Sequence, residues 1–583
     1  MKEKRRFLAM LTALMLMFSI VSCAPTTDQG ANSEAPEAEQ TETEQTPSSS
    51  GGTLVWNIGS EPKTWDPQIN TSGAGGHVII NLYEGLMRDT QDGIMKAQAQ
   101  DYKIEANSEG VENTLYTFTL RDDLKWSDGK PVTAHDYEYA WKRAADPNLA
   151  SPYAFLVTDY IKGAKEYFDG VGKAEDMKVK ALDDKTLQVE LINPTAYFLN
   201  LISFFTYMPV REDMATTGEG WEKDPAKCIT NGAFKLSEYK IGSHLTMVKN
   251  EEYWDKDNVS LSEIKALFIT DATTSLQGYQ AGEIHITSLL PREEVPKLLA
   301  EDPNFSSEKG LGLTYYAINV DKEPFNDVNV RKALALAIDR KTLVEQVRRS
   351  GEIPAAAFVA PKFKTSDGKS FRPLDENEMV VPEFEIDPWA AQVDKAKEYL
   401  AKAGFPDGKG FPEFDLVYYI RTDEQKVAEA IQQMWEKNLG IKVNLVSVEA
   451  SVFNAEQSAG KYSVSQSGWS ADYNDPMTML ALFTSNGLNS CHWRWKEYAG
   501  SPHDKILNES NKAYDELVAK AIVSTGTERD DIMKEAEKVL MDEMIIIPLY
   551  YESYTQVLDR TKVDGPGRTP IGQWDFKPYK MIN

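Results

Sequence analysis

Cysteine is scarce in this chain: its 583 residues include three, Cys23, Cys228 and Cys491. Three cysteines cannot build a disulfide framework, and none stands in a C-x-x-C pair of the kind that holds zinc or performs redox chemistry. The histidines are scattered and never form H-E-x-x-H, while G-x-S-x-G and Walker A motifs are also missing. We therefore expect no enzymatic activity, no metal and no cofactor. Whether Cys228 and Cys491 pair is left open.

Positive charge is also in short supply. The chain has 63 Lys and Arg against 90 Asp and Glu, which gives a net charge of −27. This balance argues against nucleic acid or an anionic lipid surface as the main partner. The hydrophobic fraction of 42% and the length together support a large core and two to four domains.

Long apolar runs are rare, and the clearest one lies at the amino terminus. Basic residues at positions 2–6 precede the apolar run Phe7–Val21, which is the pattern of a secretory signal and is short for a transmembrane helix. The run ends in Ile20-Val21-Ser22-Cys23, which resembles a bacterial lipobox. We expect residues 1–22 to be the signal peptide and Cys23 to carry the lipid, palmitate included. The alternative is an ordinary signal peptide with an incidental cysteine.

The next segment contains no Lys, Arg or aromatic residue between Ala24 and Gly52. Such a composition cannot bury enough apolar surface to order itself, and its acidic residues repel one another. Residues 23–52 are therefore predicted to form a disordered acidic tether between a membrane anchor and the folded body.

The body mixes strand and helix patterns. Alternating apolar residues predict strands at 53–58, 115–120 and 187–191. Apolar residues at helical spacing predict a helix from Thr422, where Gln425 completes a capping box, to Gly440, and a strand follows at once. Asp327 and Asp339 are expected to cap two further helices. Interleaved strands and helices indicate an α/β or α+β architecture.

Five blocks of residues follow one another in a characteristic order. They are Asn57-Ile58-Gly59-Ser60-Glu61-Pro62 with Leu82-Tyr83-Glu84-Gly85-Leu86; Lys125-Trp126-Ser127-Asp128-Gly129-Lys130-Pro131; Thr230-Asn231-Gly232-Ala233-Phe234 with Tyr253-Trp254; Pro324-Phe325-Asn326-Asp327 with Asp339-Arg340; and Gly468-Trp469-Ser470-Ala471-Asp472-Tyr473-Asn474-Asp475-Pro476. In this order the chain resembles the bacterial extracellular solute-binding proteins of family 5, the oligopeptide-binding receptors of peptide and nickel ABC importers. The resemblance runs from Thr53 to about Ile582. Most of these residues are expected to shape turns and cap helices.

The resemblance implies an α/β fold of the periplasmic-binding-protein type II (class C): two lobes that close about a hinge around a cleft, with an extra domain. Domain I is expected at 53–93, 210–313 and 549–583, domain II at 94–209, and domain III at 314–548.

The same resemblance places the residue that binds the peptide amino group at Asp472. The local pattern agrees, because Asp475 can cap the helix that follows and leaves Asp472 without that task. Gly468 and Ser470 are expected to offer backbone groups to the peptide, and Trp469 to wall a pocket. Further contacts are expected from Tyr153, Tyr315 and Tyr316. The alternative for Asp472 is a solvated loop aspartate.

Three glutamines mark a departure from the family. An ungapped comparison by eye puts Gln425, Gln457 and Gln466 where the better-studied branch has basic residues that bind the carboxylate end of short peptides. Without those anchors the chain is expected to favour longer peptides.

The resemblance implies a lipid-anchored, monomeric substrate-binding protein on the extracytoplasmic face of the bacterial membrane. It would capture oligopeptides and deliver them to an ABC permease whose ATPase subunits supply the energy. Alternatives are a receptor for nickel chelates, haem, opines or oligosaccharides, or a peptide-sensing lipoprotein. A surface peptidase would need an activated nucleophile or a metal site, and the sequence shows neither.

Overall fold

The computed structural model describes residues 51–376, 379–420, 422–485, 487 and 504–582. All of them belong to one compact unit, Ser49–Asn583. Cys23, the predicted tether up to residue 50 and Cys491 lie outside the described residues. Cys228 is buried beside the hydroxyl of Tyr83, and whether it pairs with Cys491 stays open because Cys491 is not described. Within the described ranges, no helix combines the length and apolar character needed to span a membrane.

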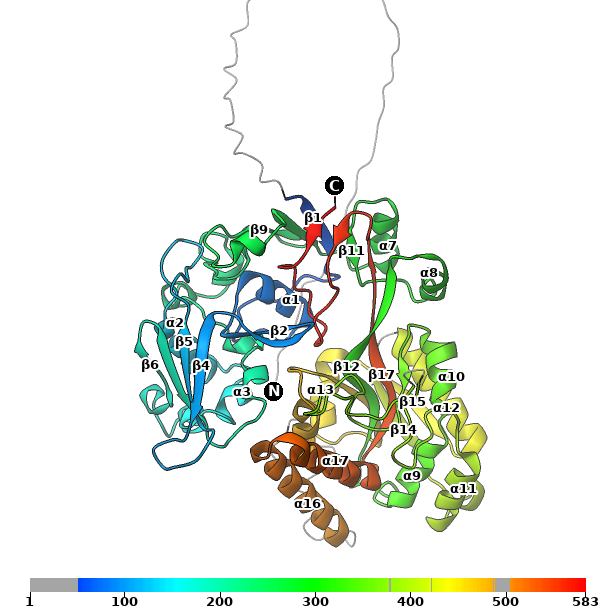
Figure 1. Cartoon of the computed structure of the whole chain (residues 1–583). Helices are drawn as coiled ribbons and strands as arrows, with labels where there is room; N and C mark the ends of the chain where they lie inside the picture. Colours follow the sequence, from blue (N-terminus) through cyan, green and yellow to red (C-terminus); the bar gives the residue numbers. More distant parts are fainter. Residues whose placement is uncertain (1–50, 377–378, 421, 486, 488–503, 583) are drawn as a thin grey trace, which may run out of the picture. The chain divides into compact units, whose positions relative to one another are not determined.

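An 11-stranded sheet forms the largest element of the fold (Figure 1). The long strands β12 and β17 pair antiparallel at its middle, with β13 added beside β17. In sheet order the strands are β15 (Val443–Val448), β14 (Phe414–Tyr419), β16 (Val464–Ser470), β12 (Phe305–Ile318), β17 (Ile546–Leu558), β11 (Ile286–Thr287), β1 (Thr53–Asn57), β10 (Glu263–Leu267), β9 (His244–Lys249) and β8 (Phe234–Lys240), with β13 at Ile353–Pro354. The strand predicted at 53–58 is confirmed as β1.

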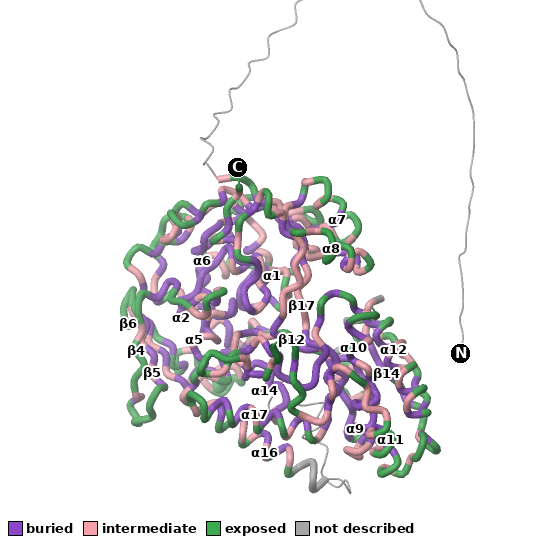
Figure 2. Tube along the Cα trace, turned by 45° about the vertical axis from the view of Figure 1, so that its right-hand side comes forward, coloured by how far each residue is buried: buried purple, intermediate pink, exposed green. Residues whose placement is uncertain are grey.

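A separate four-stranded antiparallel sheet is built from β4 (Ala99–Glu105), β5 (Leu115–Leu120), β7 (Thr186–Glu190) and β6 (Val179–Asp183). The strands predicted at 115–120 and 187–191 are confirmed as β5 and β7. Helix α2 (Ala134–Ala144) packs on β6 and β7, whereas β4 is exposed along most of its length (Figure 2). Two hairpins complete the strands, β2 (Met87–Thr90) with β3 (Gly93–Lys96), and β18 (Val563–Asp564) with β19 (Lys580–Met581).

The helices flank the sheets. The longer ones are α1 (Gly73–Leu82), α7 (Ala272–Gln280), α9 (Val328–Leu336), α11 (Val393–Lys402), α12 (Thr422–Leu439), α13 (Ala450–Ser458), α16 (Asp504–Val523) and α17 (Gly526–Glu543). Short helical turns are α3 (Phe155–Thr158), α4 (Ala164–Phe168), α5 (Phe198–Leu201), α6 (Glu212–Ala215), α8 (Val295–Glu301), α10 (Arg340–Thr342) and α14 (Met477–Leu480).

Helix caps follow the sequence prediction in most places. The carboxylates of Asp327 and Asp339 accept backbone N–H groups at the starts of α9 and α10. The segment after α10 winds as a π-helix, Leu343–Arg348, instead of a regular α-helix. Gly440 ends α12 with φ 72°, a conformation that glycine adopts without steric cost. The side chain of Gln425 donates to Glu429 one turn further along α12, and its predicted role in a capping box stays a prediction.

Buried polar contacts join the sequence blocks to one another. Glu84 is 2% exposed, and its carboxylate accepts hydrogen bonds from Tyr253 Oη and Trp254 Nε1, each at 2.6 Å, and pairs with Arg88 at 2.7 Å. The side chain of Asn231 bonds the backbone N–H and C=O of Glu84. These residues therefore hold the fold together, as expected for the blocks outside the binding site.

The predicted domain boundaries near 313 and 549 fall inside β12 and β17, the two strands that continue through the middle of the large sheet. Residues 94–209 contain the whole four-stranded sheet. The division into three domains stays a prediction.

Candidate functional site

A cavity of about 530 Å³ opens beside the carboxyl end of β16. Its side chains come from strands β12, β14, β16 and β17, from helices α12 and α13, and from the loop before α3. The lining residues are Tyr153, Thr314, Tyr419, Glu424, Phe453, Gln457, Gln466, Ser467, Gly468, Trp469, Ser470, Asp472 and Glu552. The three predicted residues of β16, the predicted Asp472 and the predicted Tyr153 thus meet in one place.

One edge of β16 is open where it lines this cavity. Strand β12 pairs with β16 along its length, from Val464 to Ser470. On the other side β14 pairs only with Val464 and Ser465. From Gln466 onward the β14 side of β16 therefore has no strand partner among the described residues. A free strand edge offers backbone N–H and C=O groups to an added, extended chain.

Asp472 lies at the end of this edge and is 8% exposed. Its carboxylate accepts a hydrogen bond from Tyr153 Oη at 3.3 Å, and its backbone N–H donates to Thr478 Oγ1 at 3.2 Å. No Lys, Arg or His of the described chain forms an ion pair with it. Burial raises the pKa of Asp472 to about 7, and the Tyr153 hydrogen bond opposes this shift. The side chain is therefore a buried acid without a cation beside it.

Tyr153 is held in place by aromatic neighbours. Its ring packs edge-on against Phe204 and Phe205, and its backbone N–H donates to Ser151 Oγ. Burial and the adjacent Asp472 raise the pKa of its hydroxyl above the ordinary value, so Tyr153 remains a hydrogen-bond donor. Since it bonds a residue 319 positions away, its role could not be derived from local pattern.

Trp469 borders two cavities. Besides the 530 Å³ cavity, it lines a smaller one of about 180 Å³ together with Asp472 and Tyr473. Its indole N–H is buried and has no hydrogen-bond partner in the described structure. A buried donor of this kind favours a ligand that brings an acceptor, such as a peptide carbonyl.

Tyr315 and Tyr316 lie elsewhere. They are 0% and 1% exposed in β12, where Tyr315 packs against Phe358 and Phe483 and Tyr316 against Trp435. Neither lines the cavity, whereas the preceding residue Thr314 does. Both tyrosines contribute to the core in this structure, and their placement gives no support to the predicted peptide contact.

Two of the three glutamines singled out in the sequence line the cavity, and the third does not. Gln457 and Gln466 line the cavity, and Gln457 Nε2 donates to the backbone oxygen of Gln466 at 2.8 Å. Gln425 is exposed on α12 and does not line it.

Sequence reasoning missed two carboxylates of the lining, Glu424 and Glu552. Glu552 is the one acidic residue of β17, a strand otherwise rich in apolar and aromatic residues. A single charge within such a strand is the signal that could have pointed to it.

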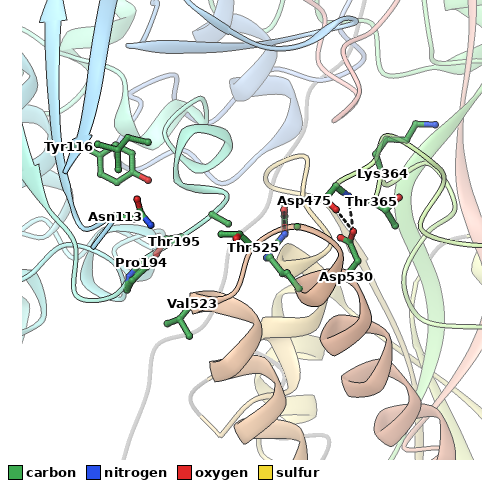
Figure 3. Close-up of a pocket in the computed structure, with 15 residues that line it drawn as sticks. Asn113, Tyr116, Pro194, Thr195, Lys364, Thr365, Asp475, Val523, Thr525 and Asp530 are labelled. Atoms are coloured by element: carbon green, nitrogen blue, oxygen red, sulfur yellow. Dashed lines mark hydrogen bonds and ion pairs between the residues drawn. The ribbon is translucent and has the colours of Figure 1, made fainter. Parts of the chain in front are cut away.

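A further cavity, of about 510 Å³, lies near the start of α17 and is lined by Thr195, Asp475 and Asp530 among others (Figure 3). Its acidic side chains already have partners: Arg529 binds Asp475 through both terminal nitrogens, at 2.9 and 2.6 Å, and Asp530 accepts from the backbone N–H of Ser366. Asp475 also accepts from the N–H of Met477 as the predicted helix cap. This cavity is therefore less suited to a cationic ligand than the one at Asp472.

Comparison with known proteins shows which family the chain belongs to. The model of the bacterial extracellular solute-binding proteins, family 5 (middle region), matches residues 105–490. The chain is 35% identical to the dipeptide-binding protein DppE of Bacillus subtilis over 99% of both chains. It is also 35% identical to the periplasmic oligopeptide-binding protein OppA of Salmonella typhimurium, over 86% of this chain and 87% of that one.

Solved structures give the fold. The murein tripeptide-binding protein MppA of Escherichia coli has a TM-score of 0.74 at 30% identity, over 92% of this chain and 99% of that one. Listeria monocytogenes OppA bound to peptide has a TM-score of 0.71 at 28% identity, over 92% of this chain and 100% of that one. The predicted type II periplasmic-binding-protein fold is confirmed. The chain belongs to the bacterial extracellular solute-binding proteins of family 5.

Proposed function

We propose that this chain is the substrate-binding protein of an ABC importer and that it captures oligopeptides in the cavity at β16. The observation that carries the proposal is Asp472, a buried carboxylate that faces this cavity without a cationic partner in the described structure. A peptide supplies the missing cation as its α-ammonium group, and the pair forms a charge-assisted hydrogen bond.

The open edge of β16 supplies the second half of recognition. A peptide that adds beside Gln466–Ser470 bonds through its backbone, which is the same in every sequence. Side chains then alternate between the two faces of the added strand and need only room and water. This arrangement suits a receptor that accepts many peptides.

The names of the relatives support peptides as the ligand class. Several are named for dipeptides, oligopeptides or murein peptide. One, at 30% identity, is named as a probable deoxycholate-binding protein. A bile acid has no ammonium group for Asp472, and neither has an oligosaccharide of neutral sugars, so the buried carboxylate favours a peptide.

The membrane anchor and the partners rest on sequence. The basic and apolar amino terminus with its lipobox supports lipidation at Cys23, and residues 24–52 would carry the body away from the bilayer. The chain then acts as a monomer on the extracytoplasmic face, delivers its peptide to the permease, and leaves ATP hydrolysis to the ATPase subunits.

Peptide capture is tested on the body from Gly51 onward, mixed with a library of free-amine peptides and analysed by native mass spectrometry and calorimetry. We expect one peptide per chain, with longer members retained at least as well as dipeptides. Retention of a sugar, bile acid or nickel chelate in place of peptide would contradict the proposal.

The lipid anchor is tested by expression of the full chain in a bacterial host. The Cys23→Ala protein should leave the membrane fraction, because it lacks the cysteine that carries the lipid.

Affinity for free-amine peptides is expected to peak between about pH 7 and pH 8. Burial raises the pKa of Asp472 to about 7 in the free protein, and a bound ammonium stabilises the carboxylate and lowers that pKa. Below this pH, binding must release a proton, so affinity falls by up to about tenfold per pH unit. Above pH 8 the peptide amino group, with an ordinary pKa of about 7.7–8.0, loses its charge. Calorimetric titration across this pH range measures the profile.

Two controls assign the acidic side of that profile. An N-acetylated peptide and the Asp472→Asn protein should each lack the fall in affinity below pH 7, because without the ammonium–carboxylate pair binding no longer requires the release of a proton. An acidic fall in affinity that persists in Asp472→Asn would assign the titration to another group.

A further inference from the structure

The cavity at β16 has a strongly one-sided charge. Three carboxylates line it, those of Glu424, Asp472 and Glu552, and its described lining contains no Lys, Arg or His. The α-ammonium of a peptide accounts for one of these negative charges. The carboxylates of Glu424 and Glu552 remain.

Glu424 already has a cation near it. Arg348 Nη1 lies 3.7 Å from Glu424, and the same guanidinium pairs with Asp423 at 3.3 Å and Glu352 at 2.9 Å. Arg292 adds a second positive charge to this group through Asp423, at 2.9 Å. Glu424 is thus part of an ion network that exists without ligand.

Glu552 has no such network. Its carboxylate accepts a hydrogen bond from Ser470 Oγ at 2.7 Å, and within the described chain it has no ion pair. Burial raises its pKa above the ordinary value for a glutamate, and the Ser470 hydrogen bond and the charge of Arg348, which forms no ion pair with it, offset the loss of water only in part.

The backbone is arranged to bring this carboxylate to the peptide edge. Glu552 belongs to β17, and it reaches across β12 to Ser470 on β16. The crossing point on β12 is Gly312, which stands opposite Ser470. A Cβ atom at position 312 would overlap the Glu552 carboxylate, so only glycine leaves this path open. Three adjacent strands therefore form one built site.

A second observation indicates that the cavity favours a ligand with hydrogen-bond donors. Gln466 is 3% exposed and lines the same cavity, and its side-chain oxygen has no hydrogen-bond partner in the described structure. A buried acceptor without a donor is costly, so a ligand that brings N–H groups beyond the α-ammonium is favoured.

We propose that Glu552 binds the cationic side chain of a lysine or arginine near the amino end of the peptide, so that the receptor selects peptides with a second positive charge. This inference rests on the proposed peptide-binding function. Asp472 holds the α-ammonium, and Ser470, which holds Glu552, lies two residues before it. Two residues of a strand span about 7 Å, so the selected side chain belongs to one of the first few residues of the peptide.

The test compares two hexapeptides of alanine that differ only at the second residue, lysine in one and its uncharged analogue norleucine in the other. Calorimetry gives the affinity of each for the wild-type body, for Glu552→Gln and for Glu109→Gln. Glu109 is a matched control because it is an exposed glutamate paired with Lys162. We expect the wild-type protein to favour the lysine peptide about tenfold, the effect of one charge-assisted hydrogen bond. Glu552→Gln should remove this preference and leave the norleucine peptide within about twofold, while Glu109→Gln should change neither.

Charge reversal gives a second, independent variant. It uses a further alanine hexapeptide, with glutamate at the second residue. Glu552→Lys should bind this peptide better than the lysine peptide, and thermal melting followed by circular dichroism verifies that the variant is folded. Equal wild-type affinities for the lysine and norleucine peptides, or an equal loss for both in Glu552→Gln, would overturn the inference while peptide capture stands. Failure of the wild-type protein to bind any of the peptides would instead overturn the proposed function, and this inference with it.

Discussion

Asp472→Asn should lose most of its affinity for peptides with a free amino group. The change keeps the shape of the side chain, but leaves a buried peptide ammonium without its counter-charge. Breaking one partner of a buried ion pair costs about 3–5 kcal/mol, which corresponds to roughly a hundredfold to several thousandfold in Kd. Calorimetric titration of wild type and variant with the same peptide measures the loss.

The chemical counterpart is removal of the ammonium from the ligand. An N-acetylated peptide should bind the wild-type protein about as weakly as the free peptide binds Asp472→Asn, and the two changes together should cost little more than either alone. This non-additivity is the signature of direct contact between the two groups. Full additivity, or unchanged binding in Asp472→Asn, would remove Asp472 from the site and leave the β16 edge as the main contact.

Glu84→Ala should destabilise the folded body by about 3–5 kcal/mol, the range for removal of one partner from a buried ionic network. The variant leaves Arg88 without one of its carboxylate partners, and leaves the buried hydroxyl of Tyr253 and the indole N–H of Trp254 without an acceptor. Urea-induced unfolding followed by tryptophan fluorescence measures the change.

Glu109→Ala is the matched control, because Glu109 is exposed and surface pairs contribute little. Peptide affinity gives a second readout. At a temperature where the Glu84→Ala protein is still folded, this protein should bind peptide as tightly as the wild type does, since Glu84 does not line the β16 cavity. A stability change no larger than that of the control would show that the network formed by these motif residues is dispensable.

Local pattern predicted much of the fold. The alternation in residues 115–120 depends on neighbours two positions apart, and the helical spacing of Val427, Ile431 and Trp435 depends on neighbours three to four apart; both are confirmed as β5 and α12. The capping-box role of Gln425 stays a prediction; its side chain donates to Glu429 along the helix, a contact that sequence spacing also permits.

The candidate site was predicted in part. Resemblance to a family located Asp472, and the residues Gly468, Trp469 and Ser470 beside it line the same cavity as expected. Tyr315 and Tyr316 have the composition of pocket residues, yet both are buried in β12, because aromatic side chains suit a core as well as a pocket.

Sequence alone thus determined the membership of the family and several strands and helices, and it singled out the carboxylate at 472 as a candidate, since each of these is written in short-range pattern or in a continuous motif. Only the tertiary structure decided which side chains share the cavity. Tyr153 meets Asp472 across 319 residues, and Glu552 reaches Ser470 over Gly312 across three strands. Pairing between distant strands follows from how whole elements pack, and no local signal encodes it.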